Sequence, residues 1–209
     1  MHEAGVIEQT ENTDYDSAIF LVAKKTGEKW LVIDLRGINA LITPKLVQLP
    51  KITELIDDIN ACKPRYYSLT DLRNGYFQIK IHEDSRPYTA FTSPSGLRYH
   101  FKVCPFDLSV SPSAMLKVSL NIFARKMDYP RSFLYMDDAL TVGKTWEEHL
   151  FNLEKMFENL QKNDMSCNPT KCEFGFTSIE YLGYQISTDG IKISQKKIEA
   201  IKKIKHLKM

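Results

Sequence analysis

Apolar residues follow two different spacings along the chain, and the spacing predicts which stretches form strands and which form helices. Short runs rich in β-branched and aromatic residues, such as 18–24 and 30–35, are typical of strands, and the charged segment between these two predicts a hairpin. Apolar residues three or four positions apart, as at Ile52, Leu55 and Ile59, predict a helix. Further strands are expected at 66–69, 77–81, 88–91, 97–103, 132–136, 139–142 and in short pieces between 172 and 187. Helices are expected at 52–60, 113–127 and 145–163, with a last one capped by Ser194.

The stretch 145–163 carries the clearest helix signal. Thr145 and Glu148 form the Thr-x-x-Glu pattern of a capping box, in which each side chain accepts a hydrogen bond from a backbone N–H at the start of the helix. One apolar stripe follows, made of Leu150, Leu153, Met156, Phe157 and Leu160. Strands and helices alternate irregularly along the chain, without an internal repeat or a Gly/Ser linker. We therefore predict an α+β fold and not a doubly wound parallel sheet.

Composition is that of an ordinary globular protein. The chain has 209 residues, of which 43% are hydrophobic and 26% charged, enough for one large domain or two to three small ones. The longest apolar runs are far below the roughly 20 residues that cross a bilayer, so no membrane partner is expected, and the first residues have no signal-peptide pattern.

Four scattered cysteines favour a reducing compartment. Cys167, Cys172 and His149 lack a second ligand pair at zinc-site spacing, so zinc is not expected there.

Positive charge is concentrated near the carboxyl end of the chain. The formal net charge is only +2, but the last 18 residues contain seven lysines and a single acid, Glu199. Such a stretch can follow the phosphate backbone of a nucleic acid. It can equally be the solvated face of a helix, and the sequence alone leaves both interpretations open. The lysines are Lys192, Lys196, Lys197, Lys202, Lys203, Lys205 and Lys208.

Three aspartates lie where apolar strands are expected to end. Asp137 and Asp138 lie between two apolar runs, and Asp71 closely follows the strand 66–69. Acidic pairs are common at hairpin tips, so an ordinary turn is one explanation. The apolar flanks, however, place like charges at the edge of a core, where bound cations would neutralise them. Two Mg²⁺ ions held by such carboxylates and by substrate phosphates can activate a hydroxyl and neutralise a leaving pyrophosphate. The pattern therefore favours metal-dependent phosphoryl transfer.

The same residues resemble the signature of reverse transcriptases. Tyr135-Met136-Asp137-Asp138 is similar to the catalytic hairpin of that family, and Leu69-Thr70-Asp71-Leu72 is similar to its first catalytic strand. Over about residues 3 to 204, the order and spacing of further blocks resemble gypsy-type long-terminal-repeat retrotransposons. These blocks are Val22 to Asn39, Gln48-Leu49-Pro50, Thr89-Ala90-Phe91, Cys104-Pro105-Phe106 with Ser111-Pro112-Ser113, Lys171-Cys172-Glu173-Phe174 and Glu180-Tyr181-Leu182-Gly183-Tyr184.

The resemblance implies a role for each matching position. Asp71 and Asp137 would bind two Mg²⁺ ions, which Mn²⁺ could replace, with Asp138 assisting and the backbone carbonyl of Leu72 as a further ligand. Tyr76 would lie under the sugar of the incoming nucleotide and exclude a 2′-hydroxyl, with a packed core aromatic as the alternative. The resemblance implies nucleotide contacts for Lys24, Lys25, Pro105 and Phe106, and primer–template contacts for Tyr135, Met136, Leu182 and Gly183. Solvent exposure of the lysines and core packing of Tyr135 and Met136 are the alternatives.

Three positions depart from the family pattern. Trp30 stands where the family has an arginine that grips the triphosphate, either because the arginine was replaced or because one residue was lost. An indole cannot replace a bidentate phosphate donor. We expect a loss of roughly two to three orders of magnitude in rate, with Lys29 compensating in part. Asp107 replaces a glycine, which would restrict the backbone and bring negative charge near the triphosphate. Met115 replaces a phenylalanine, a milder change.

The resemblance implies a right-hand polymerase fold, with a palm of antiparallel strands backed by helices. We expect fingers at 1–46 and 79–111, palm at 47–78 and 112–188, and the start of a thumb at 189–209. The chain would then begin within the fingers and end early in the thumb. It would lack the protease, RNase H and integrase segments of a full polyprotein and would hold primer–template weakly.

The leading functional prediction is an RNA-directed DNA polymerase from a retroelement polyprotein. Its partners would be an RNA or DNA template with a primer and deoxynucleoside triphosphates. Its location would be intracellular and cytoplasmic, in a virus-like particle. The alternative is a catalytically impaired, truncated remnant that only folds or binds nucleic acid. A cyclase-like palm enzyme acting on free nucleotides would explain the metal hairpin, but it would not explain the fingers blocks.

Overall fold

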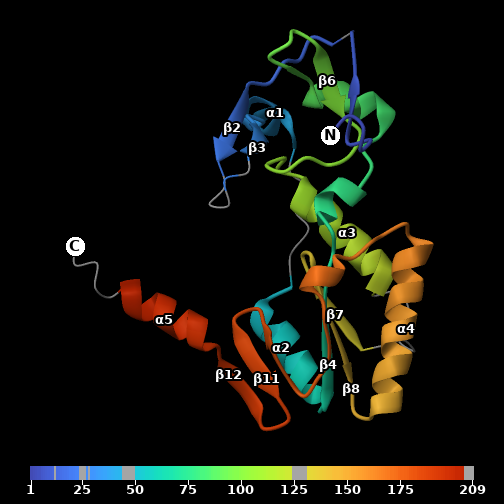
Figure 1. Ribbon diagram of the computed structural model, residues 1–209, viewed down its shortest axis with the longest axis vertical. Helices are drawn as coiled ribbons and strands as arrows, with labels where there is room; N and C mark the ends of the chain where they lie inside the picture. The colour runs from blue at the N-terminus through green and yellow to red at the C-terminus, as the bar shows by residue number, and fades with distance from the viewer. Residues whose placement is uncertain (12, 24–26, 28, 44–49, 124–130, 205–209) are drawn as a thin grey trace. The chain divides into compact units, whose positions relative to one another are not determined.

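A computed structural model describes the chain except for residues 12, 24–26, 28, 44–49, 124–130 and 205–209 (Figure 1). The described residues form two compact units. Unit 1 consists of Met1–Val47 and Asn74–Val118, and unit 2 consists of Gln48–Arg73 and Ser119–Met209. The chain therefore passes between the units three times. The division into fingers, palm and thumb stays a prediction.

Unit 1 contains two small antiparallel sheets and short helices. One sheet has the order β1-β6-β5, and β2 and β3 form a separate two-stranded hairpin. The core of unit 1 contains Ile7, Ile33, Leu35, Phe91, Phe101 and Leu108. The elements are β1 (Ile7–Gln9), β2 (Ile19–Ala23), β3 (Lys29–Ile33), α1 (Arg36–Leu41), the 3₁₀ helices η1 (Gly75–Gln78) and η2 (Glu83–Thr89), β5 (Phe91–Thr92), β6 (Arg98–Phe101) and α3 (Ser111–Phe123), which continues into unit 2.

Unit 2 is built on a four-stranded antiparallel sheet with the order β7-β8-β4-β9. A second sheet, β10-β11-β12, follows it in the chain. The elements are α2 (Ile52–Ala61), β4 (Tyr66–Asp71), β7 (Ser132–Tyr135), β8 (Asp138–Gly143), α4 (Trp146–Lys162), η3 (Pro169–Lys171), β9 (Glu173–Phe176), β10 (Ser178–Tyr181), β11 (Tyr184–Ser187), β12 (Gly190–Ile193) and α5 (Gln195–Ile204).

The two faces of the four-stranded sheet have different neighbours (Figure 1). Tyr67 and Leu140 lie on the face that forms one core with α2 and the second sheet. Helix α4 packs on β8 and β4, and Ser68 of β4 is hydrogen-bonded to His149 of α4. Within the described ranges, no helix has the length and apolarity needed to cross a bilayer.

The hairpin β2–β3, helices α2, α4 and α5, and strands β4, β6, β7 and β8 confirm the corresponding sequence predictions. Thr145 caps α4 by accepting a hydrogen bond from the Glu148 N–H at 3.1 Å. The Glu148 carboxylate accepts from the N–H of Lys144 at 3.0 Å, one residue before the position that the capping-box pattern predicts. Ser194 caps α5 by accepting from the Lys197 N–H.

Two predicted strands are wrong. The stretch 77–81 begins inside η1, because Asn74 takes a left-handed conformation (φ 49) and starts a tight turn. The stretch 88–91 begins inside η2, where Pro87 has no N–H for strand pairing. The sequence analysis also missed β1, α1 and β12, which are short. The predicted helix 113–127 is α3, described up to Phe123, and its last four positions lie outside the described residues.

Candidate active site

Asp71 and Asp138 face each other across two paired strands of unit 2. Strand β4 ends at Asp71, β8 begins at Asp138, and the antiparallel register pairs these two residues directly. Side chains of a cross-strand pair lie on the same face of a sheet. Asp137 lies in the two-residue turn between β7 and β8, and its backbone oxygen accepts a hydrogen bond from the N–H of Leu72 at 2.8 Å. The fold thus brings together the three aspartates that the sequence analysis singled out.

The surroundings of these carboxylates favour a cation. Burial raises the pKa of Asp137, and the charges of Asp138 and Asp71 raise it further. Burial and Asp71 likewise raise the pKa of Asp138. One oxygen of Asp137, Oδ1, is buried and has no hydrogen-bond partner within the described part of the chain. The Nζ atom of Lys171 lies 3.5 Å from Oδ2 of Asp71 and offsets part of the negative charge.

This arrangement fits a hard divalent cation. An unpartnered carboxylate oxygen beside two further carboxylates supplies the oxygen ligands that Mg²⁺ prefers. Among the described residues, no three His, Cys, Asp or Glu side chains lie close enough to hold an ion by themselves. Mg²⁺ usually takes one or two carboxylates and completes its shell with water and substrate phosphates. An incomplete protein shell is therefore compatible with a site that also binds a triphosphate.

The hairpin that carries Asp137 and Asp138 is held by a buried tyrosine. The hydroxyl of Tyr181 lies 3.2 Å from the backbone oxygen of Phe133 and 3.3 Å from that of Asp138, and its single hydrogen is shared between them. Burial raises the pKa of Tyr181, so the hydroxyl stays protonated and continues to donate. The turn itself is strained, because Met136 has a left-handed backbone (φ 56).

Sequence reasoning assigned no role to Tyr181 or Lys171. Each lies in a block that resembles the family, but nothing in the sequence shows what its side chain touches. Lys171 meets Asp71 across a separation of 100 residues. Pairings of this kind depend on the tertiary fold and have no local signal.

The predicted primer–template residues Leu182 and Gly183 form the turn between β10 and β11. Both have positive φ, 51 and 78, as expected for a tight two-residue hairpin. A Cβ at Gly183 would lie 3.0 Å from Cδ of Lys197, an exposed side chain that can move aside, so the conformation favours glycine here more than the space does. The Nζ atom of Lys197 lies 4.6 Å from the ring centre of Tyr184. Leu182 and Tyr135, another predicted contact residue, are partly buried against the core that contains α2.

The predicted nucleotide-pocket residues Tyr76, Pro105 and Phe106 lie in unit 1. The rings of Tyr76 and Phe106 meet edge to face with their centres 5.6 Å apart. Pro105 is buried, and its backbone oxygen accepts a hydrogen bond from the Ser111 hydroxyl at 3.0 Å. The three residues are thus held by packing and hydrogen bonding within unit 1.

Asp107 adopts a backbone conformation that is more often found for glycine. Its φ is 66, in the left-handed region, which aspartate tolerates better than most residues. The side-chain amide of Asn39 holds this turn from both sides. It donates to the backbone oxygen of Asp107 and accepts from the N–H of Ser109, each at 2.8 Å. The Asp107 substitution is therefore compatible with the local fold.

Lys24 and Lys25, the predicted phosphate contacts, lie outside the described residues. Trp30 pairs with Val22 in the β2–β3 hairpin, and its side chain is likewise outside the described part. Arg36 is engaged nearby, since its guanidinium donates to both oxygens of Asp34, at 2.8 and 2.6 Å.

The chain has a right-hand polymerase fold, with two aspartates facing each other across paired strands of its main sheet. Among solved structures, a foamy viral protease-reverse transcriptase in complex with double-stranded DNA superposes with a TM-score of 0.81 at 23% identity, over 96% of this chain and 40% of that one. The selenomethionine-labelled CSH mutant of the prototype foamy virus protease-reverse transcriptase gives a TM-score of 0.77 at 25% identity, over 92% of this chain and 24% of that one. The α+β fold predicted from the sequence is confirmed.

Sequence comparison gives the family. The family model described as reverse transcriptase (RNA-dependent DNA polymerase) matches residues 22–186, so the chain belongs to this family. It is 32% identical over 195 residues to the retrovirus-related Pol polyprotein from transposon 412 of Drosophila melanogaster. It is 34% identical over 216 aligned positions to a putative enzymatic polyprotein of Cassava vein mosaic virus. These matches cover 90% and 100% of this chain, but only 15% and 32% of the relatives.

Proposed function

We propose that this chain is the polymerase part of a retroelement polyprotein and extends a primer 3′ end with deoxynucleotides on an RNA or DNA template. The observation that carries the proposal is the direct pairing of Asp71 with Asp138 beside the unpartnered oxygen of Asp137. The Pol polyprotein relatives support a retroelement origin, and we place its activity in a cytoplasmic virus-like particle. Structures of the foamy viral enzyme with double-stranded DNA and with an RNA/DNA hybrid support the choice of nucleic-acid partner.

Divalent metal dependence is general in this family, and we propose two Mg²⁺ ions, replaceable by Mn²⁺. Asp71 and Asp137 would hold both ions, with Asp138 and the backbone carbonyl of Leu72 as further ligands. When bound, the ions would lower the pKa of the primer 3′-hydroxyl and neutralise charge on the leaving pyrophosphate. The residues of this chain would orient the 3′-oxygen and the α-phosphorus for in-line attack, and Tyr181 would keep the Asp137–Asp138 hairpin in place.

The remaining predicted contacts complete the proposal. Lys24 and Lys25 would reach the triphosphate. Tyr76, held against Phe106, would present its ring to the sugar and exclude a 2′-hydroxyl. Contacts to the nucleotide are proposed for Pro105 and Phe106, and contacts to primer and template for Tyr135, Met136, Leu182 and Gly183.

Primer extension on poly-rA/oligo-dT with Mg²⁺ tests the proposal. We expect extension by the wild type, its loss in Asp137→Asn, and its retention in Asp57→Asn, which removes an exposed carboxylate of α2. Equal extension by the wild type and Asp137→Asn would contradict the proposed site. The whole protein must be used, because neither unit has been shown to fold alone.

The second candidate is an impaired remnant that binds nucleic acid without turnover, and Trp30 is the observation that favours it. Arg36 is engaged with both oxygens of Asp34 and therefore does not take the place of the arginine that the family keeps at position 30. Trp30→Arg separates the two proposals. Extension that appears only in Trp30→Arg would favour the impaired copy. Tight binding of primer–template with no extension by either protein would favour a binding role.

A further inference from the structure

Two cysteines lie next to each other and next to Asp71. Cys167 and Cys172 flank the turn Asn168–Lys171, whose internal hydrogen bonds hold its two ends together, and each thiol lies within electrostatic range of the other. The Cys172 sulfur also lies 3.1 Å from the backbone oxygen of Asn168 and within electrostatic range of Asp71. Cys167 bridges to Leu72, the residue after Asp71. Both cysteines are reduced and only half-buried, so a small reagent can reach them.

The turn between the two cysteines is preorganised. Pro169 fixes one backbone torsion, and the side-chain oxygen of Asn168 accepts hydrogen bonds from the N–H and the hydroxyl of Thr170. The backbone oxygen of Asn168 accepts from the N–H of Lys171 at 3.0 Å. Because the turn already holds the thiols together, little conformational freedom is lost when they are joined.

The same turn contacts the catalytic strand. The N–H of Asn168 donates to the backbone oxygen of Asp71 at 2.8 Å, and Lys171 places its ammonium 3.5 Å from the Asp71 carboxylate. A covalent link between the two ends of the turn would therefore restrict both contacts. Lys171 would then compete with a divalent cation for Asp71, since both bind the same carboxylate.

We propose that Cys167 and Cys172 form a modification site, in which a low-molecular-weight disulfide of the glutathione class oxidises the two thiols to an intramolecular disulfide. The bond fixes Lys171 at Asp71 and weakens divalent-metal binding. This effect on metal binding rests on the proposed function, whereas formation of the bond does not.

The reaction balances with oxidised glutathione as the oxidant. One cysteine thiolate attacks a glutathione sulfur, breaks its S–S bond and releases one glutathione thiolate. The second cysteine thiolate attacks the cysteine sulfur of the mixed disulfide and releases the other glutathione. Two electrons pass from the cysteines to the oxidant, and the two cysteine protons end on the two released glutathiones. Burial raises the pKa of Cys172, which slows the exchange.

Formation of the bond is tested by mass spectrometry of the full chain after prolonged incubation with oxidised glutathione. The wild type should lose two hydrogens and give a linked Cys167–Cys172 peptide. Cys62→Ser, which removes another half-buried thiol of unit 2, should behave in the same way. Cys167→Ser and Cys172→Ser should stop at the mixed disulfide or remain reduced. A wild type that keeps glutathione, or that links Cys62, would overturn the proposal.

Binding of Mn²⁺, measured by electron paramagnetic resonance, tests the consequence without any turnover. Oxidised wild type should bind Mn²⁺ several-fold more weakly than reduced wild type, and dithiothreitol should restore the affinity. Lys171→Gln should abolish this difference while still forming the disulfide. Equal Mn²⁺ affinity in both redox states would overturn the link between the cysteines and the metal site. If Asp137→Asn loses Mn²⁺ binding, the measured ion is bound at the proposed metal site. If Asp137→Asn still binds Mn²⁺, the proposed metal site is wrong, whatever the redox state of the cysteines.

Discussion

Asp137 is a residue whose proposed function opposes the stability of the fold. Its carboxylate is half-buried, has an unpartnered oxygen and lies beside the charges of Asp71 and Asp138. Sequence reasoning located these aspartates because each lies where an apolar strand ends. It did not find Lys171 or Tyr181, whose contacts join residues that are far apart in the chain.

Asp137→Asn should stabilise the metal-free protein by about 1 kcal/mol. The pKa of Asp137 is raised above its ordinary value of 3.8 in the folded state, so ionisation destabilises the fold as pH rises through 3.8 and above. Urea unfolding in EDTA at pH 4 and pH 7 measures this effect, with Asp57→Asn as the control. The gain should be largest at pH 7 and should shrink when Mg²⁺ is added. A less stable variant at pH 7 in EDTA would contradict this account.

At the scale of helices and strands, sequence prediction was reliable where the residues of an element determine its structure by themselves. The cap at Thr145 and the stripe after it define α4. The errors at 77–81 and 88–91 arose where aromatic and β-branched residues, typical of strands, are held in 3₁₀ turns by their neighbours. Phe77 lies in η1 with its ring packed against that of Phe106, 5.0 Å between centres. Such packing is decided by the tertiary fold and not by propensity.

Gly143 sets how closely α4 approaches β8. A Cβ at this position would lie 2.6 Å from the backbone N and Cα of His149, so the helix would have to move. Gly143→Ala should therefore lower the free energy of unfolding by about 2–3 kcal/mol. Gly37→Ala is the control, because its Cβ meets nothing within 4 Å and it lies in α1, where alanine is favoured. Equal stabilities of the two variants in urea unfolding would show that α4 adapts freely.

His149 joins three elements of unit 2. Its Nε2 lies 2.7 Å from the Ser68 hydroxyl of β4, whose oxygen also accepts the N–H of Gly175 in β9 at 3.0 Å. Burial lowers the pKa of His149 below its ordinary value of 6.5. The unfolded chain therefore takes up a proton at a pH where the folded protein does not, and stability should fall as pH drops below 6.5.

His149→Gln should remove this part of the pH dependence. The measurement is urea unfolding between pH 7.5 and 5, compared with His82→Gln, which replaces an exposed histidine. The wild type and His82→Gln should lose stability in parallel below pH 6.5, and His149→Gln should lose less. Identical pH profiles for all three proteins would argue against a neutral, buried His149.

At the scale of the whole molecule, the two units have separate cores. The chain contains two tryptophans, Trp30 in unit 1 and Trp146 in unit 2, so each unit has its own fluorescent reporter. In Trp30→Phe and Trp146→Phe, the remaining tryptophan should report different urea midpoints, because separate cores need not unfold together. Urea unfolding followed by circular dichroism shows how far each substitution itself changes the stability of the protein, which is the control for this comparison. Coincident curves would show a single cooperative unit.

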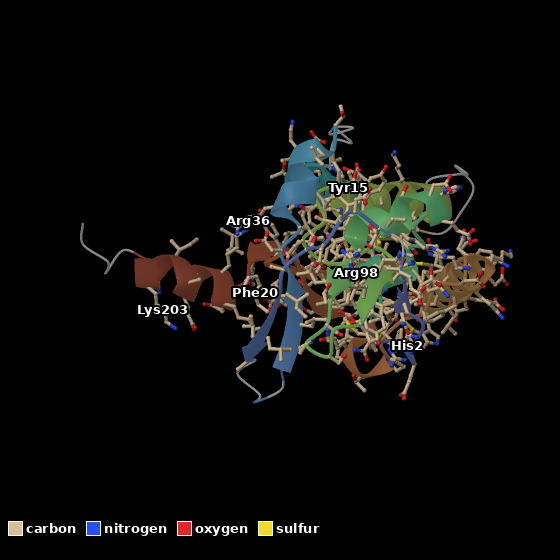
Figure 2. All side chains as sticks on the ribbon, turned by 90° about the horizontal axis from the view of Figure 1, so that it is seen from above. His2, Tyr15, Phe20, Arg36, Arg98 and Lys203 are labelled. Carbon is tan, nitrogen blue, oxygen red and sulfur yellow. The ribbon has the colours of Figure 1, made fainter. Side chains whose placement is uncertain are left out.

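The described part of the basic stretch includes helix α5, which carries exposed lysines. Lys202 and Lys203 are exposed in the last turn of α5, and Figure 2 shows where Lys203 lies on this helix. Lys196, in contrast, is paired with Glu180 at 2.9 Å. If the two lysines contact phosphates, their replacement by glutamine should reduce the slope of log affinity against log salt by about 2 on duplex DNA. Lys51→Gln and Lys63→Gln, both exposed, form the control pair. An unchanged slope would leave α5 as a solvated face, the other interpretation that the sequence allowed.

The backbone of Met136 bears on how selection has acted at this turn. Glycine adopts a φ of 56 without the cost of about 1 kcal/mol that other residues meet there. Selection for a stable fold alone would therefore replace Met136 with glycine. A need for the methionine side chain, such as the proposed contact to primer and template, would oppose that replacement. A collection of random substitutions selected only for solubility should accumulate glycine at position 136, whereas one selected for DNA synthesis should not.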